Sequence, residues 1–304
     1  MKNQKILVTG PTGQVALPVS LALARENAVW GVARFTDAAA RKRLEAGGVR
    51  CVAADLGAGD YHELPGDFDY VLNFAVSKSA DGNFDTDLRG NGEAAGLLMS
   101  HCRRARAFLH CSTTGVYQPA GHHVFRETDP LGDNHRSIMP TYSIAKIATE
   151  VVVRTMAREL RLPTTIARLC VPYGDNGGWP WYHLLMMRGG AAIPVHATRP
   201  SRYTPIHEDD IIASIPGLLR AASVPATIVN WGGQEHVSIE EWCEYLGELT
   251  GLEPRCEVNP QALDSVQVDT TRLVELVGPS KVSWKEGFRR MALARAPELL
   301  RKRS

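Results

Sequence analysis

Two side chains with complementary acid–base chemistry, Tyr142 and Lys146, stand four positions apart in the sequence Tyr-Ser-Ile-Ala-Lys. On a helix this spacing places both side chains on one face, about one turn apart. A neighbouring ammonium favours phenolate over phenol, so the spacing predicts that Lys146 lowers the pKa of Tyr142. A tyrosine tuned in this way can give a proton to a carbonyl oxygen or take one from an alcohol. Such pairs also occur on solvated helix faces, so the surrounding sequence has to decide between the two interpretations.

A glycine-containing turn lies near the start of the chain, between an expected strand at 6–8 and an expected helix at 17–24. Its sequence is Thr9-Gly10-Pro11-Thr12-Gly13-Gln14-Val15-Ala16. Glycines at such a junction let the backbone turn tightly and approach a phosphate, and the start of the helix adds free N–H donors. The turn therefore predicts a dinucleotide cofactor. The predicted contacts are Gly10, Thr12, Gly13, Gln14 and Val15.

The type of cofactor is predicted from the end of a second expected strand, at 28–33. Arg34 follows this strand, 24 positions after Gly10. An acidic residue at this place binds the 2′-hydroxyl of NAD, whereas an arginine can pair with the 2′-phosphate of NADP. We therefore expect NADP, with NAD possible, and the alternative is an ordinary surface arginine.

Strands and helices alternate along most of the chain. Further strands are expected at 49–54, 68–74, 108–112, 164–169 and 227–232. This alternation predicts an α/β fold with a doubly wound parallel Rossmann sheet, which binds ligands at the carboxyl ends of its strands. We expect a cofactor domain at 1–170, with its sheet completed by about 207–232. A smaller C-terminal substrate lobe is expected from 171–206 and 233–304.

Five segments in this order resemble the extended short-chain dehydrogenase/reductase family, also called the NAD-dependent epimerase/dehydratase family. They are the glycine turn at 9–16, Asp55-Leu56, Asn73-Phe74-Ala75, the strand end at 112–117, and the pair Tyr142 and Lys146. The resemblance extends from about residue 5 to about residue 291. The combination is specific, although each segment alone is not.

The resemblance implies a catalytic group built around Tyr142. In it Tyr142 moves the proton, Lys146 holds the nicotinamide ribose, and Thr113 binds the reacting oxygen. Asn91 matches the asparagine that opens the helix after the fourth strand. Further cofactor contacts are implied at strand ends, namely Arg34, Asp55, Leu56, Phe74, Ala75, Val76, Leu169 and Val171, together with Tyr142 and Lys146.

Two residues give opposite indications about the substrate. Sugar-nucleotide enzymes of the family usually carry asparagine where this chain has Val171, and valine has no side-chain atom that can make its hydrogen bond. Arg202 lies in a segment that resembles the one whose arginine contacts the diphosphate in those enzymes. We expect Arg202 either to pair with a carboxylate such as Glu208 or Asp209, or to bind an anionic group of the substrate.

Other substrate contacts are predicted beside the catalytic threonine and in an aromatic-rich segment. Thr114 follows Thr113 directly, and Trp179, Trp181 and Tyr182 follow a pair of glycines. These aromatic side chains either line an apolar pocket or anchor the lobe to the main domain.

The residues from His207 to Asp210 are adjacent and lack the spacing of a metal site, so no metal is predicted. Their acids are expected to cap and start a helix at 211–222. Ser238, with Glu241 three residues later, predicts a capping box at the start of another helix.

Composition bears on partners and compartment. Lys plus Arg is 34 and Asp plus Glu is 33, so the charge gives no reason to expect nucleic acid or an anionic membrane as a partner. No window reaches the ~18 apolar residues of a membrane span. The six cysteines show no Cys-x-x-Cys pair, which favours a reduced, cytoplasmic protein. Helices expected at 92–104 and 149–160 resemble the family's dimer face, so we expect a homodimer, with core packing as the alternative.

The sequence as a whole favours an NADP-dependent oxidoreductase that moves a hydride between nicotinamide and a carbonyl or secondary alcohol of a small, largely apolar molecule. One alternative is a nucleotide-sugar epimerase or dehydratase with tightly bound NAD(P). A dehydratase of this family normally carries an acid just after the catalytic threonine, where this chain has Thr114 and Gly115. The other alternative is a non-catalytic NADP-binding sensor, although such relatives usually lose the tyrosine or the lysine.

Overall fold

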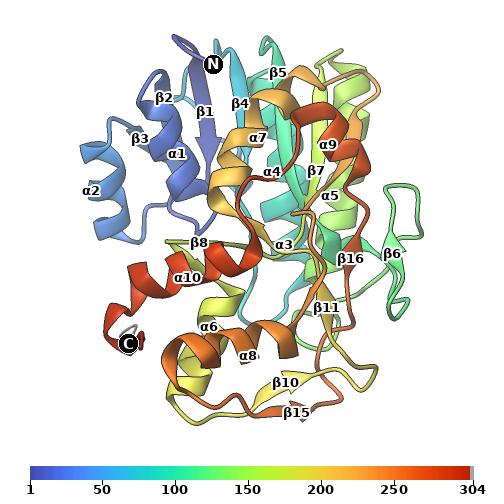
Figure 1. The fold of residues 1–304 in the computed structure, drawn as a ribbon. Helices are drawn as coiled ribbons and strands as arrows, with labels where there is room; N and C mark the ends of the chain where they lie inside the picture. The colour runs from blue at the N-terminus through green and yellow to red at the C-terminus, as the bar shows by residue number, and fades with distance from the viewer. Residues whose placement is uncertain (302–304) are drawn as a thin grey trace.

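Seven parallel strands form the central sheet of the computed structural model, which describes residues 1–301 (Figure 1). In spatial order they are β13 (Thr227–Trp231), β7 (Thr164–Leu169), β5 (Ala107–Thr113), β4 (Tyr70–Asn73), β1 (Lys5–Thr9), β2 (Ala28–Ala33) and β3 (Arg50–Ala53). The chain builds outward from β1 in both directions. This order confirms the doubly wound sheet, and it makes the junction of β1 and β4 the switch point where such folds bind ligands.

Helices cover both faces of the sheet. One face carries α1 (Ala16–Ala24), α2 (Ala38–Ala46), α7 (Glu208–Arg220) and α9 (Thr271–Val277), and the other carries α3 (Phe84–Leu88), α4 (Ala94–His101) and α5 (Tyr142–Glu159). Each layer has its own apolar core: Leu17 and Ile215 are buried on the first face, Leu98 and Val153 on the second. Because both faces are covered, the strands read as nearly continuous apolar runs.

A smaller lobe lies below the sheet in Figure 1, at the carboxyl ends of the strands. Its helices are α6 (Trp179–Arg188), α8 (Ile239–Thr250) and α10 (Trp284–Arg295). Its short strands are β8 (Pro172–Gly174), β9 (Gly177–Gly178), β10 (Ile193–Val195), β11 (Arg202–Tyr203), β12 (Ile206–His207), β14 (Val237–Ser238) and β15 (Cys256–Val258). The fully buried Trp242 is central to the lobe's core, which includes Tyr203 and Phe288.

Short elements complete the described chain. They are the 3₁₀ turns Leu56–Ala58, Thr114–Val116 and Pro297–Leu299, the π-helical turn Arg89–Glu93, and the paired strands β6 (Val124–Phe125) and β16 (Gln267–Val268). In the part of the chain that the structure describes, no helix is both long and apolar enough to cross a bilayer.

Helix starts follow local capping chemistry. The capping box at Ser238 and Glu241 is confirmed, with both reciprocal hydrogen bonds present. The helix expected at 211–222 starts earlier, at Glu208, because the His207 ring accepts the N–H of Asp209 and three acids fill the first turn. The helix expected at 92–104 is preceded by the π-helical turn that contains Asn91.

Candidate active site

Thr113, Tyr142 and Lys146 converge at the carboxyl end of β5. Thr113 is the last residue of β5, and Tyr142 and Lys146 occupy the first two turns of α5. The Thr113 hydroxyl accepts the N–H of Gly115 (3.1 Å) and lies within hydrogen-bonding reach of the Tyr142 phenol. The buried Lys146 ammonium donates to the carbonyl of Cys111 (2.8 Å). The structure therefore brings together the three residues on which proton transfer would depend.

The electrostatics at Tyr142 differ from the expectation. Burial raises the pKa of Tyr142 to about 12, and the hydrogen bond with Thr113 only partly opposes this. Burial likewise lowers the pKa of Lys146. The prediction of a lowered tyrosine pKa was thus wrong for this structure, because desolvation disfavours the phenolate and the ammonium donates to a backbone carbonyl.

Asn91 is a positioning residue. Its carboxamide donates to the carbonyls of Ser77 (2.9 Å) and Asp87 (2.7 Å) and accepts the N–H of Ser77 (3.0 Å). Both N–H donors are therefore in use, and Asn91 has no proton to offer Tyr142. It fixes the loop after β4 against the helix layer. Asp87 strengthens the same contact by accepting from the hydroxyls of Ser77, Ser79 and Thr141.

The glycine turn packs directly against the end of β4. Gly10 has a φ of +61°, and a Cβ at this position would lie 3.0 Å from the Cα of Ala75. The Thr9 hydroxyl accepts the N–H of Ala75 (2.9 Å) and donates to Asn73 (2.7 Å), which locks the two strand ends together. No side chain caps the start of α1, so its free N–H groups suit a diphosphate. The turn thus fits the dinucleotide predicted for it.

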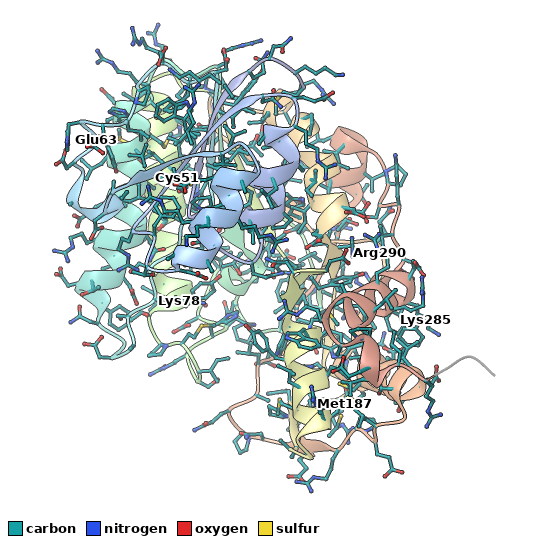
Figure 2. The ribbon with its side chains drawn as sticks, turned by 90° about the vertical axis from the view of Figure 1, so that its left-hand side faces the viewer. Cys51, Glu63, Lys78, Met187, Lys285 and Arg290 are labelled. Atoms are coloured by element: carbon teal, nitrogen blue, oxygen red, sulfur yellow. The ribbon has the colours of Figure 1, made fainter. Side chains whose placement is uncertain are left out.

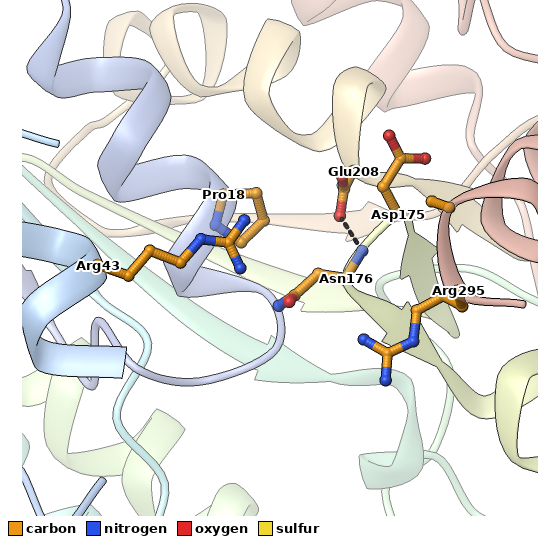
Figure 3. A pocket seen from close by; sticks show the side chains of 7 residues that line it. Pro18, Arg43, Asp175, Asn176, Glu208 and Arg295 are labelled. Atoms are coloured by element: carbon orange, nitrogen blue, oxygen red, sulfur yellow. Dashed lines mark hydrogen bonds between the residues drawn. The ribbon is translucent and has the colours of Figure 1, made fainter. Parts of the chain in front are cut away.

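Gln14 connects this turn to the lobe. The side-chain amide of Gln14 donates to the backbone carbonyls of Pro172 and Gly177 (3.4 Å each), and the backbone carbonyl of Gln14 accepts from the side-chain amide of Asn176 (2.8 Å). Asn176 also lines a cavity of about 490 Å³ between the domain and the lobe (Figure 3). The cavity is lined by Pro18, Arg43, Asp175, Asn176, Glu208, Ala294 and Arg295. It includes none of the residues around Tyr142, so it is not the place of proton transfer.

The remaining predicted cofactor residues lie at the ends of neighbouring strands. Arg34 is exposed after β2, and no carboxylate among residues 1–301 pairs with it. Asp55 follows β3 and accepts the N–H of Gly57 (2.9 Å), next to the half-buried Leu56. After the end of β4, Phe74 and Ala75 are half-buried and Val76 is exposed. At the end of β7, Leu169 is buried, and Val171 just beyond it is half-buried.

The predicted aromatic substrate residues do not gather at one place. Trp179 packs on Tyr203 and Trp242, with ring centroids 4.9 and 5.7 Å away. Trp181 is buried in the lobe core beneath the guanidinium of Arg295. The Tyr182 side chain is 62% exposed. The two tryptophans therefore pack within the lobe's own core rather than against the main domain, which differs from the expected anchor.

Arg202 meets neither of the carboxylates suggested for it. Asp209 pairs with Arg290 (2.8 Å), and Glu208 accepts the backbone N–H of Asn176. Arg202 is half-buried as a residue, and among residues 1–301 its guanidinium has no hydrogen-bond or ion-pair partner. The pKa of His236 is lowered, first by the burial of its imidazole and second by the positive charge of Arg202. The arginine is therefore available to an anion.

Two residues beside Tyr142 were missed from the sequence. The His135 and Tyr142 ring centroids are 5.1 Å apart, and the Lys78 ammonium lies 5.9 Å from the Tyr142 ring. Lys78 is labelled in Figure 2. Lys78 follows the end of β4, so its place in the chain was a usable signal. His135 lies in an irregular loop before α5, where no periodic pattern marks a side chain.

The family profile that matches this chain is that of the NAD dependent epimerase/dehydratase family, over residues 6–183. The chain belongs to this family. It is thus an NAD(P)-dependent enzyme of the extended short-chain dehydrogenase/reductase type, as the sequence segments predicted.

Individual relatives are distant. The low-salt glycan biosynthesis protein Agl12 of Haloferax volcanii is 25% identical over 242 residues, which are 74% of this chain and 75% of that protein. UDP-glucuronic acid 4-epimerase from Bacillus cereus, solved with UDP-glucuronic acid and NAD, has a TM-score of 0.81 at 19% identity and covers 94% of this chain and 97% of its own. dTDP-glucose 4,6-dehydratase from Streptomyces venezuelae, solved with NAD, has a TM-score of 0.79 at 20% identity. The match covers 95% of this chain and 96% of that one. At these identities the structural likeness shows the fold.

Proposed function

We propose that this protein is an NAD(P)-dependent enzyme that oxidises and reduces a hydroxyl-bearing carbon of a nucleotide-linked sugar, in the manner of an epimerase. The observation that carries the proposal is Arg202, a half-buried residue of the lobe whose guanidinium has no carboxylate partner among residues 1–301. Burying an unpaired arginine is costly unless an anion joins it. The diphosphate of a nucleotide sugar is such an anion, and arginine binds phosphate oxygens in a bidentate fork.

Known proteins of similar fold support this substrate class over the apolar carbonyl compound favoured by the sequence. The two enzymes of known structure described above are named for UDP-glucuronic acid and dTDP-glucose, and both structures contain NAD. Between an epimerase and a dehydratase we favour the epimerase. Thr113 is followed by Thr114 and Gly115, so no acid stands next to it to protonate a departing hydroxyl.

The chain's own residues supply position and proton control. The nicotinamide of a bound dinucleotide would contribute the hydride chemistry. The glycine turn and the start of α1 would hold the diphosphate of that dinucleotide. The Thr113 hydroxyl and the Tyr142 phenol would bind the reacting oxygen and stabilise negative charge as it develops. With a pKa of about 12, Tyr142 is protonated at neutral pH and can give its proton to a carbonyl oxygen in the reduction step. In the oxidation step the proton of the sugar hydroxyl passes to the Tyr142 oxygen, which must first have released its own proton.

A screen of UDP- and dTDP-sugars against the purified protein tests the proposal. We expect at least one to raise the melting temperature at millimolar concentration by mass action and to be converted to an isomer without net consumption of NAD(P)H. Arg202→Ala should weaken binding of that sugar by about 10- to 150-fold, which corresponds to the ~1.5–3 kcal/mol of a charged hydrogen bond. Arg301→Ala is the control, because it removes an arginine of the lobe that is exposed rather than half-buried. No response to any nucleotide sugar would overturn the proposal.

One observation favours a second function, the reduction of a carbonyl on a largely apolar molecule. Val171 has a φ of +36°, a conformation that asparagine tolerates and β-branched residues seldom adopt. Such a residue costs about 1–3 kcal/mol, and here it offers only apolar surface. Oxidation of NADPH by aromatic aldehydes or ketones, with no response to nucleotide sugars, would identify this function.

We also propose that the protein prefers NADP, on the basis of Arg34. Its side chain is exposed at the end of β2 and lacks a carboxylate partner within residues 1–301. We expect NADPH to bind more tightly than NADH, and Arg34→Ala to lose about tenfold or more in NADPH affinity through the missing charge-assisted pair. NADH affinity in the same variant is the internal control. Tighter binding of NADH by the parent protein would exclude the preference.

Finally, we propose a homodimer formed through α4 and α5. These helices pack closely, since a Cβ at Gly96 would lie 3.0 Å from Val152, and their outer surface exposes Leu97, Ile144 and Val151. Exposed apolar side chains on neighbouring helices are typical of a contact surface. Light scattering should give twice the mass of the chain, and the mass of a single chain would exclude the dimer.

A further inference from the structure

Unpaired polar atoms are concentrated in one short segment, Asp133-Asn134-His135. Seven buried side-chain nitrogen or oxygen atoms in the described residues lack a hydrogen-bond partner, and four of them belong to this segment. Both carboxamide atoms of Asn134 are among the four, although its side chain is only 6% exposed. Burying a polar atom without a hydrogen-bond partner lowers stability, so a cluster of four such atoms requires an explanation.

The segment lies beside the catalytic group. The His135 backbone N–H donates to the Ser143 hydroxyl (3.3 Å), which itself donates to the carbonyl of Gly115 (2.7 Å). A Cβ at Gly115 would lie 2.5 Å from Nδ1 of His135, so the imidazole fills the space directly after Thr113 and Thr114. On its other side the ring faces Tyr142 at 5.1 Å. The His135 ring is therefore held next to the place where the substrate oxygen would react, and Asn134 directly precedes it in the chain.

The same loop reaches the lobe. The Ser137 hydroxyl donates to the carbonyl of Gln261 (2.8 Å), and a few residues further on Ser265 accepts the backbone N–H of Arg202 (2.9 Å). A ligand held between Tyr142 and Arg202 would thus be bordered by this loop.

The chemistry of the segment selects a kind of ligand. Burial and the charge of Lys78 lower the pKa of His135 to about 4, so the imidazole is neutral at pH 7. Two of the unpaired atoms, on Asp133 and Asn134, are oxygen acceptors, the Asn134 nitrogen carries two N–H donors, and Nδ1 of His135 donates or accepts according to its tautomer. An acceptor-rich group next to a carboxylate repels an anion, whereas hydroxyl groups can donate to its acceptors and accept from its amide.

We propose that Asn134 and His135 form a subsite for the hydroxylated ring of the substrate, beside Tyr142. The assignment rests on the proposed function, since a nucleotide-linked sugar provides such a ring while its diphosphate goes to Arg202. Because the four atoms are shielded from solvent, the segment has to shift to meet the ring. The movement costs less free energy because these four side-chain atoms make no hydrogen bonds that it would have to break.

The first test is Asn134→Leu, which keeps the approximate shape of the side chain and removes its polar atoms. With the nucleotide sugar identified in the screen, KM is expected to rise at least tenfold while the affinity for NAD(P)H stays within twofold of the parent. Without substrate, the melting temperature is expected to rise by about 2–4 °C, because the variant no longer buries unpaired polar groups. Ile138→Ala is the control, because it shortens an exposed side chain of the same loop without touching an unpaired atom, and its KM should remain that of the parent.

The second test is His135→Phe, which keeps a ring against Gly115 and Tyr142 and should raise KM in the same way if Asn134→Leu does not fold. A KM within twofold of the parent in the folded variants would overturn the subsite. A lower melting temperature with unchanged KM would overturn it too, since it would mean that these atoms are satisfied by bound water. If the parent protein itself responds to no nucleotide sugar, the proposed function fails, an outcome distinguishable from a sugar that binds parent and variants equally.

Discussion

Tyr142→Phe is expected to lower turnover by about 10²-fold or more while cofactor affinity stays close to that of the parent protein. The substitution removes the phenolic proton and keeps the ring, which packs against His135 with centroids 5.1 Å apart. Thr113 and Lys146 keep their own hydrogen bonds to backbone groups, so the site should stay assembled. Turnover of the identified substrate and titration of NADPH by fluorescence measure the two effects separately.

Tyr70→Phe is the matched control for this prediction. Tyr70 begins β4 at the opposite end of the strand from Asn73, and its ring lies under Arg106, so losing its hydroxyl should leave turnover unchanged. Near-parental turnover in Tyr142→Phe would show that the catalytic group is misassigned. A parallel loss of NADPH affinity would show instead that the substitution disturbs the cofactor site.

The fold was predictable because its signals are local. The apolar run at 164–169 is β7 without any change of bounds, and Ser238 and Glu241 form their capping box from residues three apart. The start of α7 differs from the expected bound, because the cap at His207 begins the helix at Glu208, a few residues before the predicted start. The positions of Thr113, Tyr142 and Lys146 were predictable for the same reason, since a strand end and one helix suffice to place them.

Properties that depend on distant contacts were not predictable. The spacing of Tyr142 and Lys146 gave the wrong direction for the tyrosine pKa, because the burial that raises it comes from packing around the helix start. Arg202 has no pair with Glu208 or Asp209 because Arg290 and the backbone at Asn176 occupy those acids. His135 reaches Tyr142 through an irregular loop, whose course no sequence period encodes.

The second large effect is expected at a buried ion pair under the catalytic strand end. Glu150 accepts two hydrogen bonds from Arg168 (3.0 and 2.8 Å) and one from the Ser112 hydroxyl (2.6 Å), with both charged side chains only 2% exposed. Arg168 also donates to the Tyr117 hydroxyl (3.1 Å). The pair therefore ties α5 and β7 to the residue that precedes Thr113.

Glu150→Leu is expected to lower the free energy of unfolding by about 3–5 kcal/mol, because it leaves the Arg168 guanidinium buried without its counter-charge. The double variant Glu150→Leu, Arg168→Met is expected to recover much of that loss, since apolar side chains of similar size can replace a buried pair at little cost. Urea unfolding of the parent, both single variants and the double variant forms a complete cycle. Additive losses around the cycle would show that the two charges are not coupled.

The same cycle separates stability from positioning. In the double variant the Ser112 hydroxyl loses its acceptor and the Tyr117 hydroxyl loses a donor, while Thr113 keeps the N–H of Gly115. If the ion pair serves only to hold the fold, turnover should return together with the free energy of unfolding. If it also fixes the strand end, stability should recover while turnover stays low, because a shift of about 1 Å at the reacting oxygen is enough to cost about 10²-fold. We expect the second outcome, since Ser112 joins the pair directly to the residue that positions the substrate.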